Sequence, residues 1–402
     1  MLGILNDIRV LELSNTVGGA FAAKLLADQG ARVIKMEKPL EGDQSRHEPP
    51  FLGGDPDPEK SSLFLALNTN KRGITLNLES ASGRQLLLRL VKDADLVIES
   101  FTPSYLDNLG VGFEAMLKVN PRVVLTSVTY FGQTGPYSQY HGDDLICQAM
   151  GGFLYGVTGF NDRAPMGTAL YQMELTSGRN AANASMVALM QQKQGGLGQH
   201  VDVSVYESSV SVPGGAMYPY SFNGAVSRRP AADTAVLDGM HLKTKDGEAT
   251  LTTAGTGGKP METWAELLGA PALLDPRFKT RDARRTLWKE QFDVVQEKLL
   301  QWTNDDLMRE TMARGLVIGL VLSTFQVVES EHLKARKFWV EIDHPVAGKF
   351  KYPGPGFLMD GANPLAGSMP APLLGQHNVA VFCDQLGITK EDLGILVASG
   401  AV

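Results

Sequence analysis

The first third of the chain alternates short apolar runs with segments of helical spacing. Residues 9–13 and 33–36 are β-branched and apolar, and residues 20–29 between them are rich in Ala and Leu and precede Gly30. This order predicts a strand, a helix that ends at the glycine, and a second strand parallel to the first. Such a unit connects its strands by a right-handed crossover.

The same alternation continues over the next hundred residues. Further strands are predicted at 73–78, 95–99 and 123–128, and a helix with an apolar Leu86/Leu87/Leu90 face at 80–93. Strands that alternate with helices in this way predict a doubly wound, Rossmann-like α/β domain with a parallel sheet.

A different pattern follows. Residues 174–193 lack Pro, contain many Ala and have no Gly after Gly178, which predicts a long buried helix. Residues 199–205 alternate and predict a strand. Residues 241–252 form two alternating runs across Asp246-Gly247, which is a hairpin signal. Helices are predicted beyond it at 260–268, 283–301 and 304–314.

The length of 402 residues predicts two domains. We expect a large α/β domain at 1–200, a linker at 201–225, a smaller α+β domain at 226–325, and a linker that returns to the large domain at 326–402. Residues 340–375 are rich in Pro and Gly and are predicted to be extended coil. Short helices are predicted at 378–386 and 390–399.

Composition excludes several classes of protein. Hydrophobic residues make up 43% and charged residues 20% of the chain, which argues against disorder. The net charge of −7 and the lack of a basic stripe argue against nucleic acid as a partner, although a local group of cations can still bind an anionic small molecule.

The two cysteines, Cys147 and Cys383, form no CxxC pair, so we expect no metal site and a reducing compartment. The start of the chain lacks a signal-peptide pattern, and the apolar run at 316–322 is too short for a membrane span. We therefore expect a cytoplasmic protein without a membrane partner.

The loop at 14–20 follows the first predicted strand, where a nucleotide-binding fold places its ligand. It lacks the GxGxxG fingerprint, which argues against a nicotinamide cofactor. A tight turn and a backbone approached by another ligand both remain open. No GxSxG or HExxH motif is present, so a serine nucleophile and this type of metal site are not indicated.

Glu174 stands at the start of the predicted long helix among apolar or small neighbours. Burial raises the pKa of a carboxyl group, whereas a helix N-terminus lowers it. A carboxylate that is ionised but poorly hydrated is a good nucleophile. The alternative is that Glu174 only stabilises the helix dipole.

Six runs in order carry a resemblance over nearly the whole chain: LNDIRVLEL at 5–13, LLADQGARVIKME at 25–37, NKRGI at 70–74, DLVIESF at 95–101, GLGQHVDVS at 196–204 and APLLGQH at 371–377. The chain resembles the class III CoA-transferases, a family that includes formyl-CoA:oxalate and crotonobetainyl-CoA:carnitine CoA-transferases. The resemblance implies a large doubly wound domain, a small domain, and two chains interlocked in a homodimer.

It also implies a CoA-transferase reaction with acyl-CoA and a small carboxylic acid as substrates and with no tightly bound cofactor. In this family one carboxylate forms a mixed anhydride and then an enzyme–CoA thioester. That carboxylate is an aspartate, and a gapless count back from Gly198-Gln199-His200 places Glu174 there. Glutamate is one methylene longer, so its reacting oxygen is displaced by about 1.5 Å.

The resemblance places Thr16, Val17 and Gly18 beside the pantetheine and the thioester. Ser100 and Phe101 match an Asn-Phe pair that contacts the coenzyme, so one polar contact differs.

Cations are expected at the nucleotide end of the coenzyme. Lys38 matches a residue that meets the phosphates, and Lys71 and Arg72 are expected beside the adenosine, at the edge of the sheet that binds ligands. Asn108 replaces an arginine of the family. The run at 68–73 that contains two of these cations is also typical of a solvated turn.

His141, Asp143 and Asp144 match a Lys, a Tyr and a Glu that border the active site of formyl-CoA transferase, and this difference argues against oxalate and formate as substrates. The α-methylacyl-CoA racemases of the same fold are the alternative. Their catalytic histidine is replaced here by Asp143, so a racemase is the second hypothesis for the function. A member that has lost its activity is a third reading.

Overall fold

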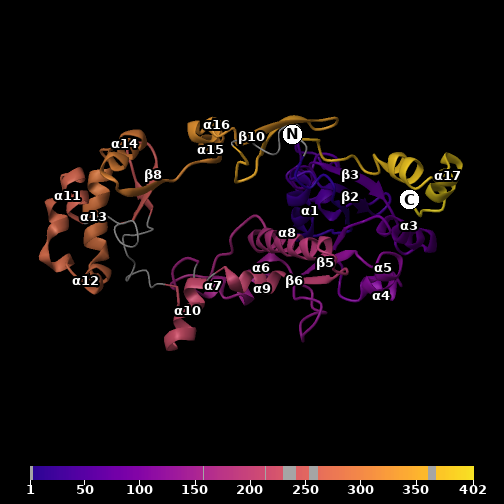
Figure 1. Ribbon diagram of the computed structural model, residues 1–402. Helices are drawn as coiled ribbons and strands as arrows, with labels where there is room; N and C mark the ends of the chain where they lie inside the picture. The colour runs from indigo at the N-terminus through magenta and orange to yellow at the C-terminus, as the bar shows by residue number, and fades with distance from the viewer. Residues whose placement is uncertain (1–2, 157, 213, 230–240, 253–260, 361–367) are drawn as a thin grey trace. The chain divides into compact units, whose positions relative to one another are not determined.

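The computed structural model describes residues 3–156, 158–212, 214–229, 241–252, 261–360 and 368–402 (Figure 1). The chain divides into two compact units. The first unit combines Met1–Val157, Gly167–Ser227 and Lys337–Val402, and the second combines Thr158–Met166 and Arg228–Arg336. The domain limits expected from sequence stay a prediction, because compactness alone does not show which segments fold independently.

The first unit contains a six-stranded parallel sheet with the order β3-β2-β1-β4-β5-β6. This is the doubly wound order, and it confirms the predicted fold class. The strands are β1 (Arg9–Glu12), β2 (Arg32–Glu37), β3 (Lys71–Thr75), β4 (Leu96–Glu99), β5 (Val124–Thr129) and β6 (His200–Ser204).

The other elements of the first unit connect these strands or follow them. They are α1 (Val17–Asp28), η1 (Gln44–His47), α2 (Ser62–Leu67), α3 (Ala81–Val91), α4 (Tyr105–Asn108), α5 (Phe113–Val119), α6 (Asp144–Met150), α7 (Phe153–Gly156), α8 (Gln172–Lys193), α9 (Val205–Ser211), α10 (Gly214–Asn223), β10 (Trp339–His344), β11 (Gly348–Pro353), η5 (Val379–Gln385) and α17 (Lys390–Ala398).

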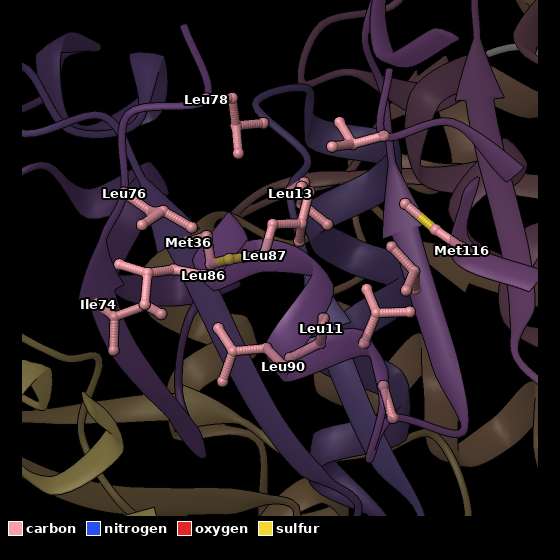
Figure 2. Packing of buried hydrophobic residues seen from close by; sticks show 14 of the residues in the cluster. Leu11, Leu13, Met36, Ile74, Leu76, Leu78, Leu86, Leu87, Leu90 and Met116 are labelled. Carbon is pink, nitrogen blue, oxygen red and sulfur yellow. The ribbon is translucent and has the colours of Figure 1, made fainter. Parts of the chain in front are cut away.

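Both faces of the sheet are buried, because successive side chains of a strand point to opposite faces. Val10 of β1 belongs to a cluster with Ala22 of α1 and Ala181 of α8. The next residue, Leu11, belongs to a second cluster with α3 and the C-terminal helices. Figure 2 shows this second cluster, in which the predicted leucine face of α3 packs among side chains of β1, β2 and β3.

The predicted strand at 73–78 is in fact β3, which begins two residues earlier at Lys71. Asn70 has a φ of 65° and makes the turn, so Lys71 and Arg72 lie in the strand and not in a solvated turn. The polar character of Lys71 concealed this start, because its side chain is buried in an ion-pair cluster that sequence patterns do not reveal.

The second unit contains the antiparallel sheet β7-β8-β9. The predicted hairpin is confirmed, with the Thr244 N–H donating to the Gly247 carbonyl at 2.9 Å. Trp264, Leu299 and Leu307 form part of its buried core. The elements are β7 (His241–Lys243), β8 (Glu248–Thr252), α11 (Met261–Leu268), η3 (Pro271–Leu274), η4 (Pro276–Phe278), α12 (Arg281–Thr286), α13 (Trp288–Leu299), α14 (Asn304–Arg314), β9 (Val317–Leu320), α15 (Thr324–Glu329) and α16 (Glu331–Ala335).

The prediction of extended coil over 340–375 is wrong at its start. The strands β10 and β11 pair there as an antiparallel hairpin. Its signal is an alternation that buries Ile342 and His344 on one side of β10, and the Pro and Gly residues that suggested coil lie mostly beyond β11.

Candidate active site

The loop between β1 and α1 lies where the strand order of the sheet reverses, since β1 stands between β2 and β4. Ligands of doubly wound sheets bind outside the carboxyl ends of the strands at this point. The Ser100 hydroxyl, just after β4, accepts from the backbone N–H groups of Asn15 at 3.0 Å and Thr16 at 3.3 Å. The Thr16 hydroxyl accepts from the Gly19 N–H and caps α1. Side-chain hydrogen bonds therefore hold the loop from β4 and from the start of α1.

Close packing of α1 against α8 brings this loop onto the start of α8. A Cβ on Gly18 would lie 2.8 Å from Ser177 Oγ and 3.1 Å from the carbonyl oxygen of Glu174. A Cβ on Gly178 would lie 2.6 Å from the carbonyl oxygen of Gly18. Any larger residue would force the two helices apart, so the geometry of the site depends on both glycines.

The Glu174 side chain lies in this contact and is only 3% exposed. Its Oε2 accepts from the Gly18 N–H at 3.2 Å, and its Oε1 accepts from the Tyr130 hydroxyl at 3.1 Å. Burial raises the pKa of Glu174 above its ordinary value, although the Gly18 N–H and the Tyr130 hydroxyl act in the opposite direction. The pKa of Tyr130 is also raised, by burial and by Glu174, so its hydroxyl remains a donor.

Glu174 lines a cavity of about 140 Å³ together with Tyr130 and His141. A second cavity of about 440 Å³ lies along the carboxyl edge of the sheet and includes Lys38. Residues 100–102 line both cavities. A long ligand therefore has a path from an exposed ammonium group at one end to a buried carboxylate at the other.

Comparisons with known proteins identify the family of this chain. Residues 5–378 match the model of CoA-transferase family III. The chain belongs to this family. It is 32% identical to succinyl-CoA–D-citramalate CoA-transferase of Chloroflexus aurantiacus, over 99% of this chain and 98% of that protein. It is 31% identical to formyl-CoA:oxalate CoA-transferase of Streptomyces avermitilis, over the whole length of both.

A solved structure shows the same fold. The crystal structure of a CAIB/BAIF family protein from Brucella suis superimposes with a TM-score of 0.82 at 29% identity, over 96% of this chain and all of that chain. Together with the family match, this makes the chain a class III CoA-transferase in fold and in enzyme class, and it makes acyl-CoA its substrate class.

The structure of this family III chain brings together some of the expected site residues. The 16–18 loop, the 100–101 pair and His141 all lie around Glu174 or along the two cavities. Asn108 is exposed at the end of α4 and does not line either cavity. Asp143 is exposed and caps α6 by accepting from the Ile146 N–H, whereas Asp144 is buried.

The sequence predicts Lys71 and Arg72 at the ligand-binding carboxyl edge of the sheet, and this placement is wrong. Both residues begin β3 and so stand toward the opposite, amino edge. The Lys71 ammonium is 2.7 Å from Glu12 Oε2 and donates to the Ala20 carbonyl, and the residue is 1% exposed. Burial lowers the pKa of Lys71 to about 8. Arg72 lines a separate cleft together with Arg9 and Arg32.

Sequence patterns missed two residues near the candidate site, Tyr130, which donates to Glu174, and Gln148, which donates to Asp144. Tyr130 follows β5 directly, and the rule that ligands gather at carboxyl ends of strands was a signal for it. Gln148, buried on α6 four residues after Asp144, gave no signal because a single Gln in a helix is ordinary.

Within the described part of the chain, no three His, Cys, Asp or Glu side chains are grouped so that they could hold a metal ion. None of its helices is long and apolar enough to cross a membrane.

Proposed function

We propose that this class III enzyme moves CoA from an acyl-CoA thioester to a carboxylic acid through covalent intermediates on Glu174. The observation that supports this role is a buried carboxylate that faces a cavity and has one backbone and one hydroxyl donor on its two oxygens. A raised pKa also marks a carboxylate that water solvates poorly, which favours nucleophilic attack.

The steps balance without any oxidant or metal. A Glu174 oxygen attacks the thioester carbonyl, the C–S bond breaks, and CoA leaves as a thiolate, which gives a mixed anhydride. The thiolate attacks the Glu174 carbonyl carbon and expels the first acid as its carboxylate, which gives a glutamyl–CoA thioester. The carboxylate of the second acid attacks the carbonyl carbon of this thioester, the C–S bond breaks, and CoA leaves as a thiolate, which gives a new anhydride. CoA thiolate then attacks the acyl carbon of that anhydride and releases the new acyl-CoA and free Glu174.

The donors around Glu174 suit these steps. Each tetrahedral intermediate develops negative charge on an oxygen, and a fixed N–H or O–H donor stabilises that charge without reorganisation. The Gly18 N–H and the Tyr130 hydroxyl are such donors. Burial of the site protects the anhydride from water, so the energy of the thioester is kept.

The two cavities divide the substrate. We assign the nucleotide to the cavity with Lys38 and the reacting acyl group to the cavity of about 140 Å³, which favours a short acid. The relatives whose names include oxalate and D-citramalate support small dicarboxylic acids as the first class to screen. The replacement of the formyl-CoA transferase set by His141, Asp143 and Asp144 argues that oxalate itself is not the acceptor.

The proposal includes an interlocked homodimer, as the family resemblance implies. It also includes a location in the cytoplasm, because two cysteines form no disulfide framework and favour a reducing compartment. The racemase alternative is not favoured, because the family and the relatives reported above are transferases and Asp143 stands in place of the histidine.

Mass spectrometry tests the covalent role. After incubation with a panel of short acyl-CoA thioesters and an acid quench, we expect a CoA adduct on the peptide that contains Glu174. The adduct should disappear on addition of an acceptor acid and should be absent in Glu174→Gln, whose transfer rate should fall by about a thousandfold or more. Turnover by Glu174→Gln would contradict the assignment, and α-deuterium exchange without an adduct would support the racemase.

A further inference from the structure

The turn that leads into α8 is strained. Leu170 has a φ of 68° and Tyr171 a φ of 54°, in the left-handed region that residues other than glycine rarely adopt. Tyr171 occupies the N-cap position of α8, and its side chain caps nothing. Strain of this kind persists only where surrounding contacts determine the conformation, and it concentrates at functional sites.

A buried carboxylate on another helix caps α8 instead. Asp144 is 8% exposed, and its Oδ1 accepts from the N–H groups of Met173 at 2.7 Å and Glu174 at 3.0 Å. Its Oδ2 accepts from Gln148 Nε2 at 2.6 Å. The same Gln148 amide accepts from the Thr168 N–H at 2.8 Å and donates to the Thr168 carbonyl at 3.0 Å. Asp144 and Gln148 therefore hold both sides of the strained turn.

This cap decides what Glu174 can do. A carboxylate in the first turn of a long helix is attracted to the free N–H groups of its own helix. Here Asp144 has taken two of those donors, including the N–H of Glu174 itself. The Glu174 carboxylate bonds the Gly18 N–H and Tyr130 from other elements instead, and lines the cavity.

We propose that Asp144, held by Gln148, is a positioning residue: it caps α8 and fixes the strained turn so that the Glu174 carboxylate is directed at the acyl-CoA. The inference rests on the proposed nucleophilic role of Glu174. Asp144 forms no bond to substrate in this scheme and is not a catalytic residue.

The charge of Asp144 acts on Glu174 as well. It adds to burial in raising the pKa of Glu174. Other titratable groups around the two carboxylates come from several elements, and within the described residues they are Tyr130 after β5, Asp143 and Cys147 next to or on α6, and Tyr171 before α8. Removal of the Asp144 charge should therefore lower the pKa of Glu174 in the folded protein.

Two substitutions separate the cap from the charge. Asp144→Asn keeps an oxygen that can accept from both N–H groups but removes the charge. We expect kcat within about tenfold of the parent and an acidic limb of kcat/KM at lower pH. Asp144→Ala removes both the cap and the charge, and a shift of about 1 Å at Glu174 should reduce kcat about a hundredfold with little change in the KM for acyl-CoA.

Thr389→Ala removes the cap of α17 and is the matched control. Neither its kcat nor the acidic limb of its kcat/KM profile should differ from the parent.

A readout without substrate separates this inference from the proposed function. The difference in melting temperature between the parent and Glu174→Gln, followed against pH, reports the ionisation of Glu174. Because the folded pKa is raised, the relative stability of the parent falls as pH rises from the ordinary glutamate pKa to the folded one, and then levels off. In the Asp144→Asn background this fall should end at lower pH.

The inference is overturned if Asp144→Asn leaves this curve and the acidic limb unchanged, or if Asp144→Ala keeps the parental kcat. If Glu174→Gln retains turnover, the nucleophile assignment fails by itself, and the melting curves still decide whether Asp144 acts on Glu174.

Discussion

Both edges of the parallel sheet carry cationic side chains, but the surroundings of these side chains differ between the carboxyl edge and the amino edge. At the carboxyl edge, Lys38 stands at one end of a pair of cavities that leads to Glu174, whose oxygens are met by fixed donors. At the amino edge, Arg9, Arg32 and Arg72 line a larger cleft of about 730 Å³. Arg9 lies 3.8 Å from Asp95 and is half-exposed, so its ion pair is weak.

The comparison indicates that neither cavity size nor positive charge marks the candidate active site in this fold. What distinguishes the carboxyl edge is the convergence of loop N–H groups and buried polar side chains, because loops that follow parallel strands meet there. A substitution that disturbs this convergence should affect turnover far more than removal of a surface arginine.

Among the changes that test this comparison, the largest effect is expected for Gly18→Ala. The added methyl group would meet Ser177 Oγ at 2.8 Å and the Glu174 carbonyl oxygen at 3.1 Å, so α1 and α8 must separate. Overpacking of this kind costs about 1–3 kcal/mol of stability. A displacement of the Gly18 N–H and Glu174 by up to about 1 Å should reduce kcat roughly a hundredfold.

Gly394→Ala is the control for this change. Its Cβ would meet nothing within 4 Å in α17, so stability should be kept or slightly improved and the rate unchanged. Steady-state kinetics and thermal melting measure both variants. Parental kcat in a folded Gly18→Ala protein would show that the α1–α8 contact does not set the geometry of the site.

A smaller effect is expected for Tyr130→Phe. Loss of a hydrogen bond to a charged group costs about 1.5–3 kcal/mol, which corresponds to a decrease in kcat of roughly ten- to a hundredfold. The hydroxyl lowers the pKa of Glu174, so its removal should move the acidic limb of the rate profile to higher pH.

This shift is opposite in direction to the one expected for Asp144→Asn. Tyr137→Phe removes an exposed hydroxyl close by in sequence and serves as the control. An acidic limb that stays in place in Tyr130→Phe would mean that the Tyr130 contact does not influence the ionisation of Glu174.

Local patterns predicted the features that depend on local physics. The doubly wound α/β class with its parallel sheet, the leucine face of α3 and the hairpin across Asp246-Gly247 followed from periodicity and turn residues. The helix-start environment singled out Glu174, and the structure finds it buried.

Contacts between residues distant in sequence could not be predicted from local patterns. The start of β3 at Lys71 depends on Glu12, 59 positions earlier by residue number, because a carboxylate partner makes burial of the ammonium tolerable. Likewise, the cap of α8 comes from Asp144 on another helix, and the donor to Glu174 comes from Tyr130. A residue whose role depends on a partner distant in sequence shows no periodic signal.

The smallest effect tests the comparison of the two edges directly. Lys38 is half-exposed and pairs with Glu41 at 2.8 Å, so its contact with a phosphate group would be screened by solvent and salt. Lys38→Ala should raise the KM for acyl-CoA a few-fold, with little change in kcat, and the difference from the parent should shrink at high salt.

Arg72→Ala and Arg32→Ala change the amino edge instead, and their KM for acyl-CoA should equal that of the parent at every salt concentration. The sequence alone predicts that Arg72 behaves like Lys38, whereas the register of β3 separates the two residues. A salt-dependent rise in KM for Arg72→Ala without one for Lys38→Ala would therefore mean that the nucleotide reaches the amino edge, and the assignment of the Lys38 cavity would be wrong.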